Sequence, residues 1–194
     1  VLWQSLTGAM GMGGVALPAR LDGAEMGQVG LAIAMMELGR RLVPSPYFSS
    51  IAMATQAILL AGTAAQQDAL LPPIASGDTV AALAWRGTGR GQDVAARLSD
   101  ALVLSGEAGF VPFGHVAGLL VVAARRDQGG IALVAIPADV PGVSVERHVS
   151  MDLTRALSTL HFADVALSPE HLLGDGDDCT AALSRTLDLA RIAL

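Results

Sequence analysis

The apolar residues in the first 77 positions recur at helical spacing and are interrupted by glycine and proline. This pattern predicts the end of a helix over 1–11 and a long helix over 24–42. Apolar positions in the long helix fall near one face, which predicts a stripe that packs in the core. The residues of this expected stripe are Met26, Val29, Ile33, Met36 and Leu38.

Two further helices are expected before residue 77. The first covers 47–60. The second begins at Thr63 and Gln66, which have the spacing of a capping box, where each side chain satisfies a free backbone donor of the other residue. The prolines Pro72 and Pro73 remove backbone donors, so we expect this helix to end at about Leu71.

From residue 79 onward the pattern changes to short β-type runs separated by glycine-rich breaks. The predicted strands are 79–85, 95–99, 101–105, 116–124, 131–137, 143–149 and 158–167. The apolar runs 119–124 and 131–136 indicate strands that are covered on both faces. Helical spacing returns from Thr180 to Leu194.

Together these elements predict an α+β fold in three parts. A helical N-terminal domain over 1–77 is followed by an antiparallel, β-barrel-like middle domain over 78–173, and residues 174–194 start a C-terminal helical bundle. A chain of 194 residues is long enough for one large domain or for two small domains with real cores.

Composition narrows the class of protein. The chain is 52% hydrophobic and 15% charged, which is well outside the disordered range. Its basic residues are all arginine, are scattered along the chain and accompany a formal charge of −6, which argues against nucleic acid as a partner. No apolar run reaches the roughly 20 residues of a membrane span, and no signal peptide is recognisable, so we expect a cytoplasmic protein.

The cysteine and the histidines offer little chemistry. The single cysteine, Cys179, excludes an intramolecular disulfide and has no local support as a catalytic thiol. The histidines show no metal-ligand spacing with each other or with the cysteine, so no metal site is expected. These histidines are His115, His148, His161 and His171.

Three passages of sequence occur in a specific order. The first pairs GVALP at 14–18 with MELGR at 36–40, the second is LPPIASG at 71–77, and the third joins SMDLTR at 150–155 to LHFADV at 160–165. In this order and spacing they resemble the acyl-CoA dehydrogenase family. The variant DLTR at 152–155 resembles family members that act on sterol side chains and other bulky acyl groups, some of which are heteromeric.

The resemblance implies a reaction, a cofactor and partners. In the family a glutamate removes the α-proton of an acyl-CoA thioester while the β-hydride passes to FAD, which gives the trans-2-enoyl-CoA. The electrons then pass to an electron-transfer flavoprotein, and a homo- or hetero-oligomer is expected. The family's base region has no counterpart in these residues, so we assign no catalytic residue and expect the base beyond the end of this chain.

The resemblance also places the flavin against two strands. The residues assigned to cofactor binding are Leu83, Ala84, Trp85, Gly87, Gly89, Phe110, Val111 and Pro112. Phe110 keeps an aromatic ring for the isoalloxazine. Ala84 lacks the hydroxyl of the family pattern, and Pro112 offers neither a hydroxyl nor an N–H. Trp85 has two interpretations, a stacking partner of a ring or a buried residue of the sheet.

Three arginines have open roles. Arg86 and Arg90 fit either a phosphate site or a solvated polar loop. Arg155 either fixes Asp152 locally or contacts the substrate or a neighbouring subunit, and we assign Arg90 and Arg155 to substrate binding.

Three functional hypotheses follow. The first is a segment of an FAD-dependent acyl-CoA dehydrogenase. The second is a non-catalytic or degenerate subunit that assembles with an active partner, which the losses at Ala84 and Pro112 favour. The third is an unrelated α+β domain without a cofactor.

Overall fold

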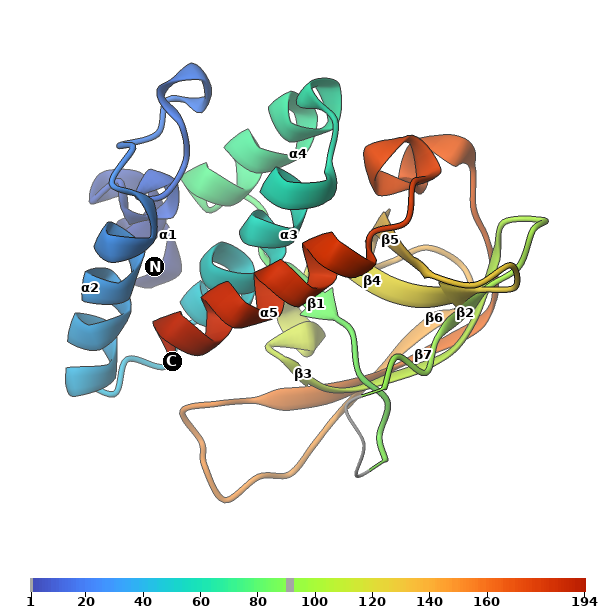
Figure 1. Cartoon of the computed structure of the whole chain (residues 1–194). Coiled ribbons are helices and arrows are strands. Elements are labelled where there is room, and N and C mark those ends of the chain that lie inside the picture. The colour runs from blue at the N-terminus through green and yellow to red at the C-terminus, as the bar shows by residue number, and fades with distance from the viewer. Residues whose placement is uncertain (1, 90–92) are drawn as a thin grey trace.

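The computed structural model describes residues 2–89 and 93–194, with helices gathered on one side and a sheet on the other (Figure 1). The α-helices are α1 (Leu2–Gln4), α2 (Gly27–Arg40), α3 (Thr55–Ala61), α4 (Ala64–Ser76) and α5 (Thr180–Ala193). The π-helical segments are η1 (Ser5–Ala9) and η4 (Phe48–Ala54), and the 3-10 turns are η2 (Met12–Gly14), η3 (Ala19–Leu21), η5 (Gly114–Val116), η6 (Pro169–His171) and η7 (Leu173–Gly176). Helix α5 packs against α2, α3 and η4. The α+β class expected from the sequence is confirmed.

The sheet is mixed. Its strands are β1 (Ala81–Ala84), β2 (Arg97–Leu98), β3 (Val103–Pro112), β4 (Leu119–Arg126), β5 (Ile131–Pro137), β6 (Val143–Arg147) and β7 (Leu157–Ala166). Their order is β1-β4-β2-β3-β7-β6, and β5 pairs with β4. The expectation of an antiparallel sheet is wrong in part, because β4 runs parallel to both β1 and β2. The connection from β1 to β4 passes through β2 and β3, which gives it the length that a parallel pairing requires.

Two hydrophobic cores lie on opposite faces of β4 and β5. Val121 and Leu133 pack into the core that contains the helices, whereas Val122 and Val134 pack into the core of the sheet half. Successive strand residues point to opposite faces, so each strand contributes to both cores. The expectation that these two apolar strands are covered on both faces is confirmed.

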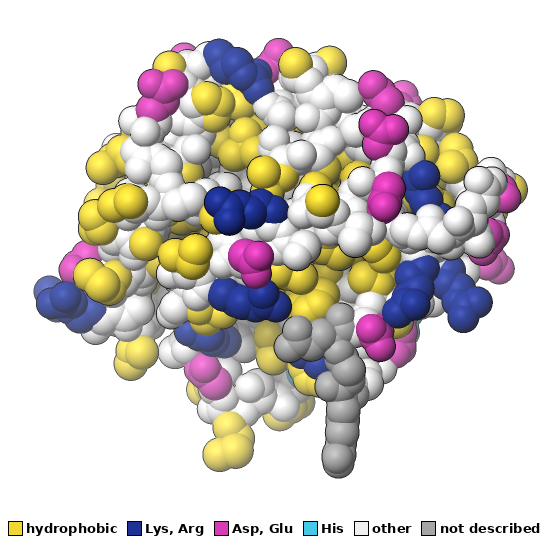
Figure 2. Space-filling model, viewed as in Figure 1, with side chains coloured by type: hydrophobic (Ala, Val, Ile, Leu, Met, Phe, Trp, Pro, Cys, Tyr) yellow, Lys and Arg dark blue, Asp and Glu magenta, His cyan; other side chains and the backbone are white. Residues whose placement is uncertain are grey.

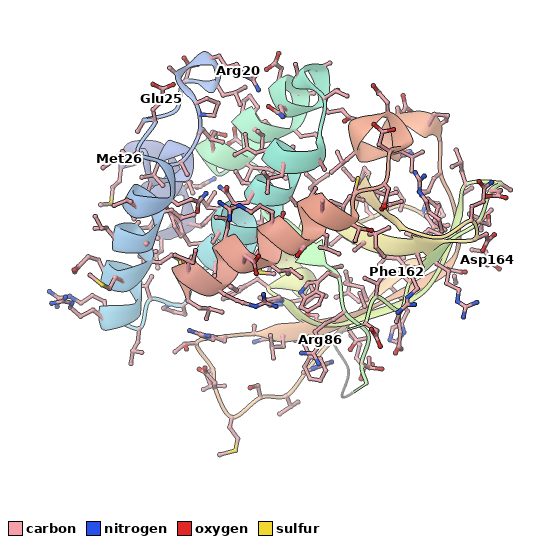
Figure 3. The ribbon with its side chains drawn as sticks, in the orientation of Figure 1. Arg20, Glu25, Met26, Arg86, Phe162 and Asp164 are labelled. Carbon is pink, nitrogen blue, oxygen red and sulfur yellow. The ribbon has the colours of Figure 1, made fainter. Side chains whose placement is uncertain are left out.

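Helix α2 turns a different face to the core from the one that the sequence indicates. Leu31 is fully buried, and Leu38 is partly buried against the core. The other four residues of the expected stripe are between 53% and 73% exposed: Met26, Val29, Ile33 and Met36. Figure 3 shows Met26 on the outer side of α2. The prediction was wrong because α2 carries apolar residues around most of its circumference, so the period alone does not select the inner face.

Helix α4 starts where the sequence predicts and ends later. The capping box is confirmed, since the Gln66 N–H donates to Thr63 Oγ1 at 3.3 Å and the Thr63 N–H donates to Gln66 Oε1 at 3.0 Å. The helix then passes through the proline pair to Ser76 and ends at Gly77, whose φ of 86° is the left-handed conformation common after helices. Pro72 lies on the exposed side of the helix, where a carbonyl oxygen left without a proline N–H is open to solvent.

The face of the molecule in Figure 2 shows no dominant charge, because arginine and acidic side chains are interspersed on it. Within residues 2–89 and 93–194, no helix combines the length and the apolar character needed to cross a membrane. The same residues contain no group of histidine, cysteine and carboxylate side chains arranged to hold a metal ion.

Candidate functional site

A cavity of about 380 Å³ lies where the end of β3 meets the helical half of the molecule. Its lining is mainly apolar and comes from the C-terminal part of α2, segment 42–48, the end of β3 and loop 150–157. Pro112 and Arg155, which the sequence assigned to cofactor and substrate binding, both line it. Two residues 43 positions apart in the chain therefore meet at one site.

Strand β3 is longer and less regular than the sequence indicates. The predicted strand ended at residue 105, whereas β3 runs to Pro112. Its pairing with β7 shifts register between Ala108 and Val111, and Phe110 has a φ of 54°. A bulge of this kind changes the direction in which side chains point. Phe110 is accordingly 42% exposed, while the neighbouring Val111 is buried.

The exposed ring of Phe110 contacts two other side chains. The guanidinium carbon of Arg86 lies 4.9 Å from the centroid of the ring, which is a cation–π distance. His148 meets the ring at a right angle with centroids 5.9 Å apart, and its Nε2 lies 2.7 Å from Thr159 Oγ1. Arg86, labelled in Figure 3, belongs to the loop that follows β1. The three side chains form a contiguous cluster beside the end of β3.

The loop that carries Arg155 is held by its own hydrogen bonds. Asp152 Oδ1 accepts from the N–H of Thr154 at 2.9 Å and from its hydroxyl at 2.6 Å. The hydrogen bond from the Thr154 side chain is the main reason that the pKa of Asp152 lies below its usual value. No ion pair found among the described residues joins Asp152 to Arg155. Thr154 is therefore the main partner of Asp152, and the charge and backbone N–H of Arg155, which lines the same cavity, lower the pKa of this carboxyl to a smaller extent.

The two predicted cofactor residues that lie within β1 are buried, whereas Phe110 in β3 is exposed. The side chains of Leu83 and Ala84 are fully buried in β1 and contact the cores instead of solvent. Trp85 follows the last residue of β1, is half-buried and packs against the helical core.

The two glycines that follow differ in their surroundings. A Cβ at Gly87 would lie 2.7 Å from the Cβ of Ala95, so the close approach of these two chain segments requires glycine there. A Cβ at Gly89 would meet nothing within 4 Å. Arg90, assigned from the sequence to substrate binding, lies outside the described residues.

Tyr47 and Gly39 are among the residues of the cavity wall that sequence reasoning missed. Tyr47 is buried, its hydroxyl donates to the Met12 carbonyl oxygen at 2.7 Å, and burial raises the pKa of this hydroxyl well above its usual value. A signal existed in the sequence, because this only tyrosine follows a proline at the start of a helical run. Gly39 lines the cavity with open space in front of its missing Cβ.

Comparison with known proteins identifies the family. A family model described as the N-terminal domain of acyl-CoA dehydrogenase matches residues 1–78. A solved structure of a Tcur3481-Tcur3483 steroid ACAD variant is 33% identical, with a TM-score of 0.85 over 99% of this chain and 51% of its own. The chain belongs to the acyl-CoA dehydrogenase family.

Two further proteins are similar over nearly the whole chain. The ChsE4-ChsE5 complex from Mycobacterium tuberculosis is 26% identical, with a TM-score of 0.85 over 99% of this chain and 52% of its own. The human mitochondrial short-chain specific acyl-CoA dehydrogenase is 27% identical over 96% of this chain and 49% of its own length. The chain thus spans about half the length of the relatives that it matches.

Proposed function

We propose that this chain is the N-terminal and middle part of an FAD-dependent acyl-CoA dehydrogenase that converts an acyl-CoA thioester to its trans-2-enoyl-CoA. The observation that carries the proposal is the mainly apolar cavity at the end of β3, which both Pro112 and Arg155 line. An apolar cavity with few polar groups suits the acyl part of such a substrate. The exposed guanidinium of Arg155 provides a cation for the anionic part.

The end of β3 fits a flavin ring better in shape than in hydrogen bonds. Phe110 offers an exposed aromatic ring, and Pro112 adds apolar surface on the cavity. The side chains of Ala84 and Val111 are buried, and Pro112 has no N–H to donate. FAD, when bound, supplies the hydride acceptor. In this proposal the residues of this chain orient the ring by packing and exclude water from its edge.

The proposed acyl group is bulky. The volume of about 380 Å³ lies within the range of roughly 300–1,000 Å³ typical of small-molecule sites. The Tyr47 hydroxyl donates its hydrogen bond to the Met12 carbonyl oxygen, so it adds little polarity to the cavity wall. The steroid ACAD among the similar structures and the DLTR sequence at 152–155 both support a sterol side chain or a similarly large group.

The proposed reaction needs groups that the described residues do not supply. The base is expected outside this chain, in the part of the relatives that it does not match. An electron-transfer flavoprotein is the proposed electron acceptor, and assembly with identical or related subunits is part of the proposal. This chain alone is therefore expected to bind ligand and not to turn over.

A second candidate function is a non-catalytic or degenerate subunit that assembles with an active partner. The contact between Arg86 and Phe110 favours it, because the guanidinium covers part of the ring that a flavin would use. The ChsE4-ChsE5 relative is itself a complex of two different proteins.

An absorbance spectrum separates the two functions. The protein is purified alone and after co-expression with a candidate partner subunit, and the bands of oxidised flavin at about 370 and 450 nm are measured. Flavin that is retained by the protein alone supports the dehydrogenase, and bleaching by an acyl-CoA is expected only in a preparation that also contains the part that supplies the base. Flavin that is retained only with the partner supports a shared site, and its absence in both preparations contradicts flavin binding.

A further inference from the structure

Backbone contacts between the loop after β1 and strand β3 hold Arg86 close to Phe110. The Gly109 N–H donates to the Arg86 carbonyl oxygen at 2.8 Å, which ties the loop after β1 to the bulge of β3. A Cβ at Gly109 would lie 3.0 Å from Thr88 Cα, so only glycine lets the loop approach this closely. The Thr88 hydroxyl also bonds the carboxylate of Glu107 in β3. These contacts hold Arg86 in front of the ring.

The ring itself is held in a strained position. A φ of 54° is unfavourable for a bulky residue, and such conformations concentrate at functional sites. His148 contacts Phe110 at a right angle, and its link to Thr159 fixes this second neighbour. Phe110 is 42% exposed, and the Arg86 guanidinium lies over its ring.

We propose that Arg86 is a specificity-determining residue that covers the Phe110 ring against planar ligands. A guanidinium is planar and stacks on aromatic faces, so an incoming isoalloxazine competes with it for the same surface. The inference rests on the proposed function, which supplies the flavin as the competing ring. It goes further by naming the residue of this chain that limits how tightly the ring is held.

The opposite role for Arg86 predicts the opposite result. If the guanidinium served as an anchor for the pyrophosphate of FAD, its removal would weaken FAD and leave riboflavin unchanged, because riboflavin has no phosphate. If it covers the ring, its removal strengthens both ligands by the same factor, because both carry the same isoalloxazine. The two ligands therefore distinguish the roles with one substitution.

The experiment titrates riboflavin and FAD into the wild-type chain and the Arg86→Gln variant, with flavin fluorescence as the readout. We expect Arg86→Gln to tighten both ligands by about two- to fivefold, the factor that corresponds to an exposed cation–π contact. Arg97→Gln is the matched control, since Arg97 is an exposed arginine of the same sheet, and it should leave both affinities unchanged. Weaker FAD binding, unchanged binding or no flavin binding by Arg86→Gln overturns the proposal.

A second readout does not depend on flavin. The side-chain protons of Arg86 should show an upfield ring-current shift in NMR spectra, and this shift should disappear in Phe110→Leu. Its absence in the wild-type chain overturns the proposal even when flavin binds. The proposed function is judged separately, by the flavin content of the protein purified with its partner.

Discussion

The hydroxyl of Ser50 makes two hydrogen bonds to Ala81, donating to its carbonyl oxygen at 2.8 Å and accepting from its N–H at 2.9 Å. Both residues are fully buried. Ala81 opens β1, which ends the sheet order, so a side chain from η4 takes the place of a neighbouring strand. This pairing joins the helical half of the molecule to the sheet.

Replacement of Ser50 should destabilise the fold more than replacement of its neighbour. Ser50→Ala leaves the buried Ala81 N–H without an acceptor, which costs roughly 1–3 kcal/mol in free energy of unfolding. Ser49→Ala is the control, because the Ser49 hydroxyl lies 3.4 Å from the same carbonyl oxygen and bonds Pro46 as well. Urea denaturation measures both variants, and equal losses would contradict the double hydrogen bond.

Two substitutions test which face of α2 is buried. Leu31→Ala removes a fully buried side chain and should cost about 2–5 kcal/mol of stability. Ile33→Ala removes an exposed one and should stay within about 0.5 kcal/mol. Thermal or urea unfolding gives both values. A larger stability loss for Ile33→Ala than for Leu31→Ala would show that the face predicted from the sequence is the buried one.

The close approach at Gly109 predicts the effect of one added methyl group. Gly109→Ala pushes against the backbone of Thr88 and should cost about 1–3 kcal/mol of stability through overpacking. Gly89 lies next to Thr88 in the loop after β1, and a Cβ there would meet nothing within 4 Å. Gly89→Ala should therefore change stability by less than about 0.5 kcal/mol. Both variants are measured by urea denaturation, and a Gly109→Ala variant as stable as Gly89→Ala would refute the contact.

Asp178 predicts a loss of stability in acid. The Thr180 hydroxyl is the main cause that lowers the pKa of Asp178 below 3.8, followed by the N–H groups of Ile131 and Thr180. The charged form is thus favoured in the folded chain, so its contribution is present above pH 3.8 and is lost as the pH falls through the lower folded pKa. The stability difference between wild type and Asp178→Ala should therefore shrink in acid.

The same measurement has an internal check. Thr180→Val removes the strongest of these hydrogen bonds and should move the loss of stability to higher pH. A difference between wild type and Asp178→Ala that stays constant from pH 6 to pH 2 would contradict the role of the carboxylate.

Local patterns in the sequence were the most informative about the fold. The capping box at Thr63 and the doubly covered strands β4 and β5 depend on nearby residues, and both were found in advance. The inner face of α2 depends on which side the rest of the chain packs against, and periodicity carries no information on that choice where apolar residues surround the helix. The parallel pairing of β4 likewise depends on contacts between distant segments.

The site was harder to predict for the same reason. The resemblance pointed to Pro112 and Arg155, and the fold brings them to one cavity. The bulge that exposes Phe110 and brings it against Arg86 arises from the register between β3 and β7, which residue types alone do not reveal. That Tyr47 and Gly39 share one cavity with Pro112 depends on how α2 and segment 42–48 pack beside the end of β3, which the sequence pattern does not indicate.

The central claim is that the cavity at the end of β3 receives the acyl group, and a variant that fills it tests this most directly. Gly39 lines the cavity, and a side chain there meets no other atom at its Cβ. Gly39→Phe is therefore accommodated without a clash at its Cβ, and we expect its ring to fill part of the cavity; Gly39→Ala is the matched control.

Calorimetry would compare the binding of decanoyl-CoA and free CoA to the wild-type chain and both variants. We expect decanoyl-CoA to bind the wild-type chain and Gly39→Ala at least about tenfold more tightly than CoA, since burial of two methylene groups already gives that factor. Gly39→Phe should remove most of this difference. Equal affinities for the two ligands in the wild-type chain, or an unchanged difference in Gly39→Phe, would contradict the assignment of the cavity.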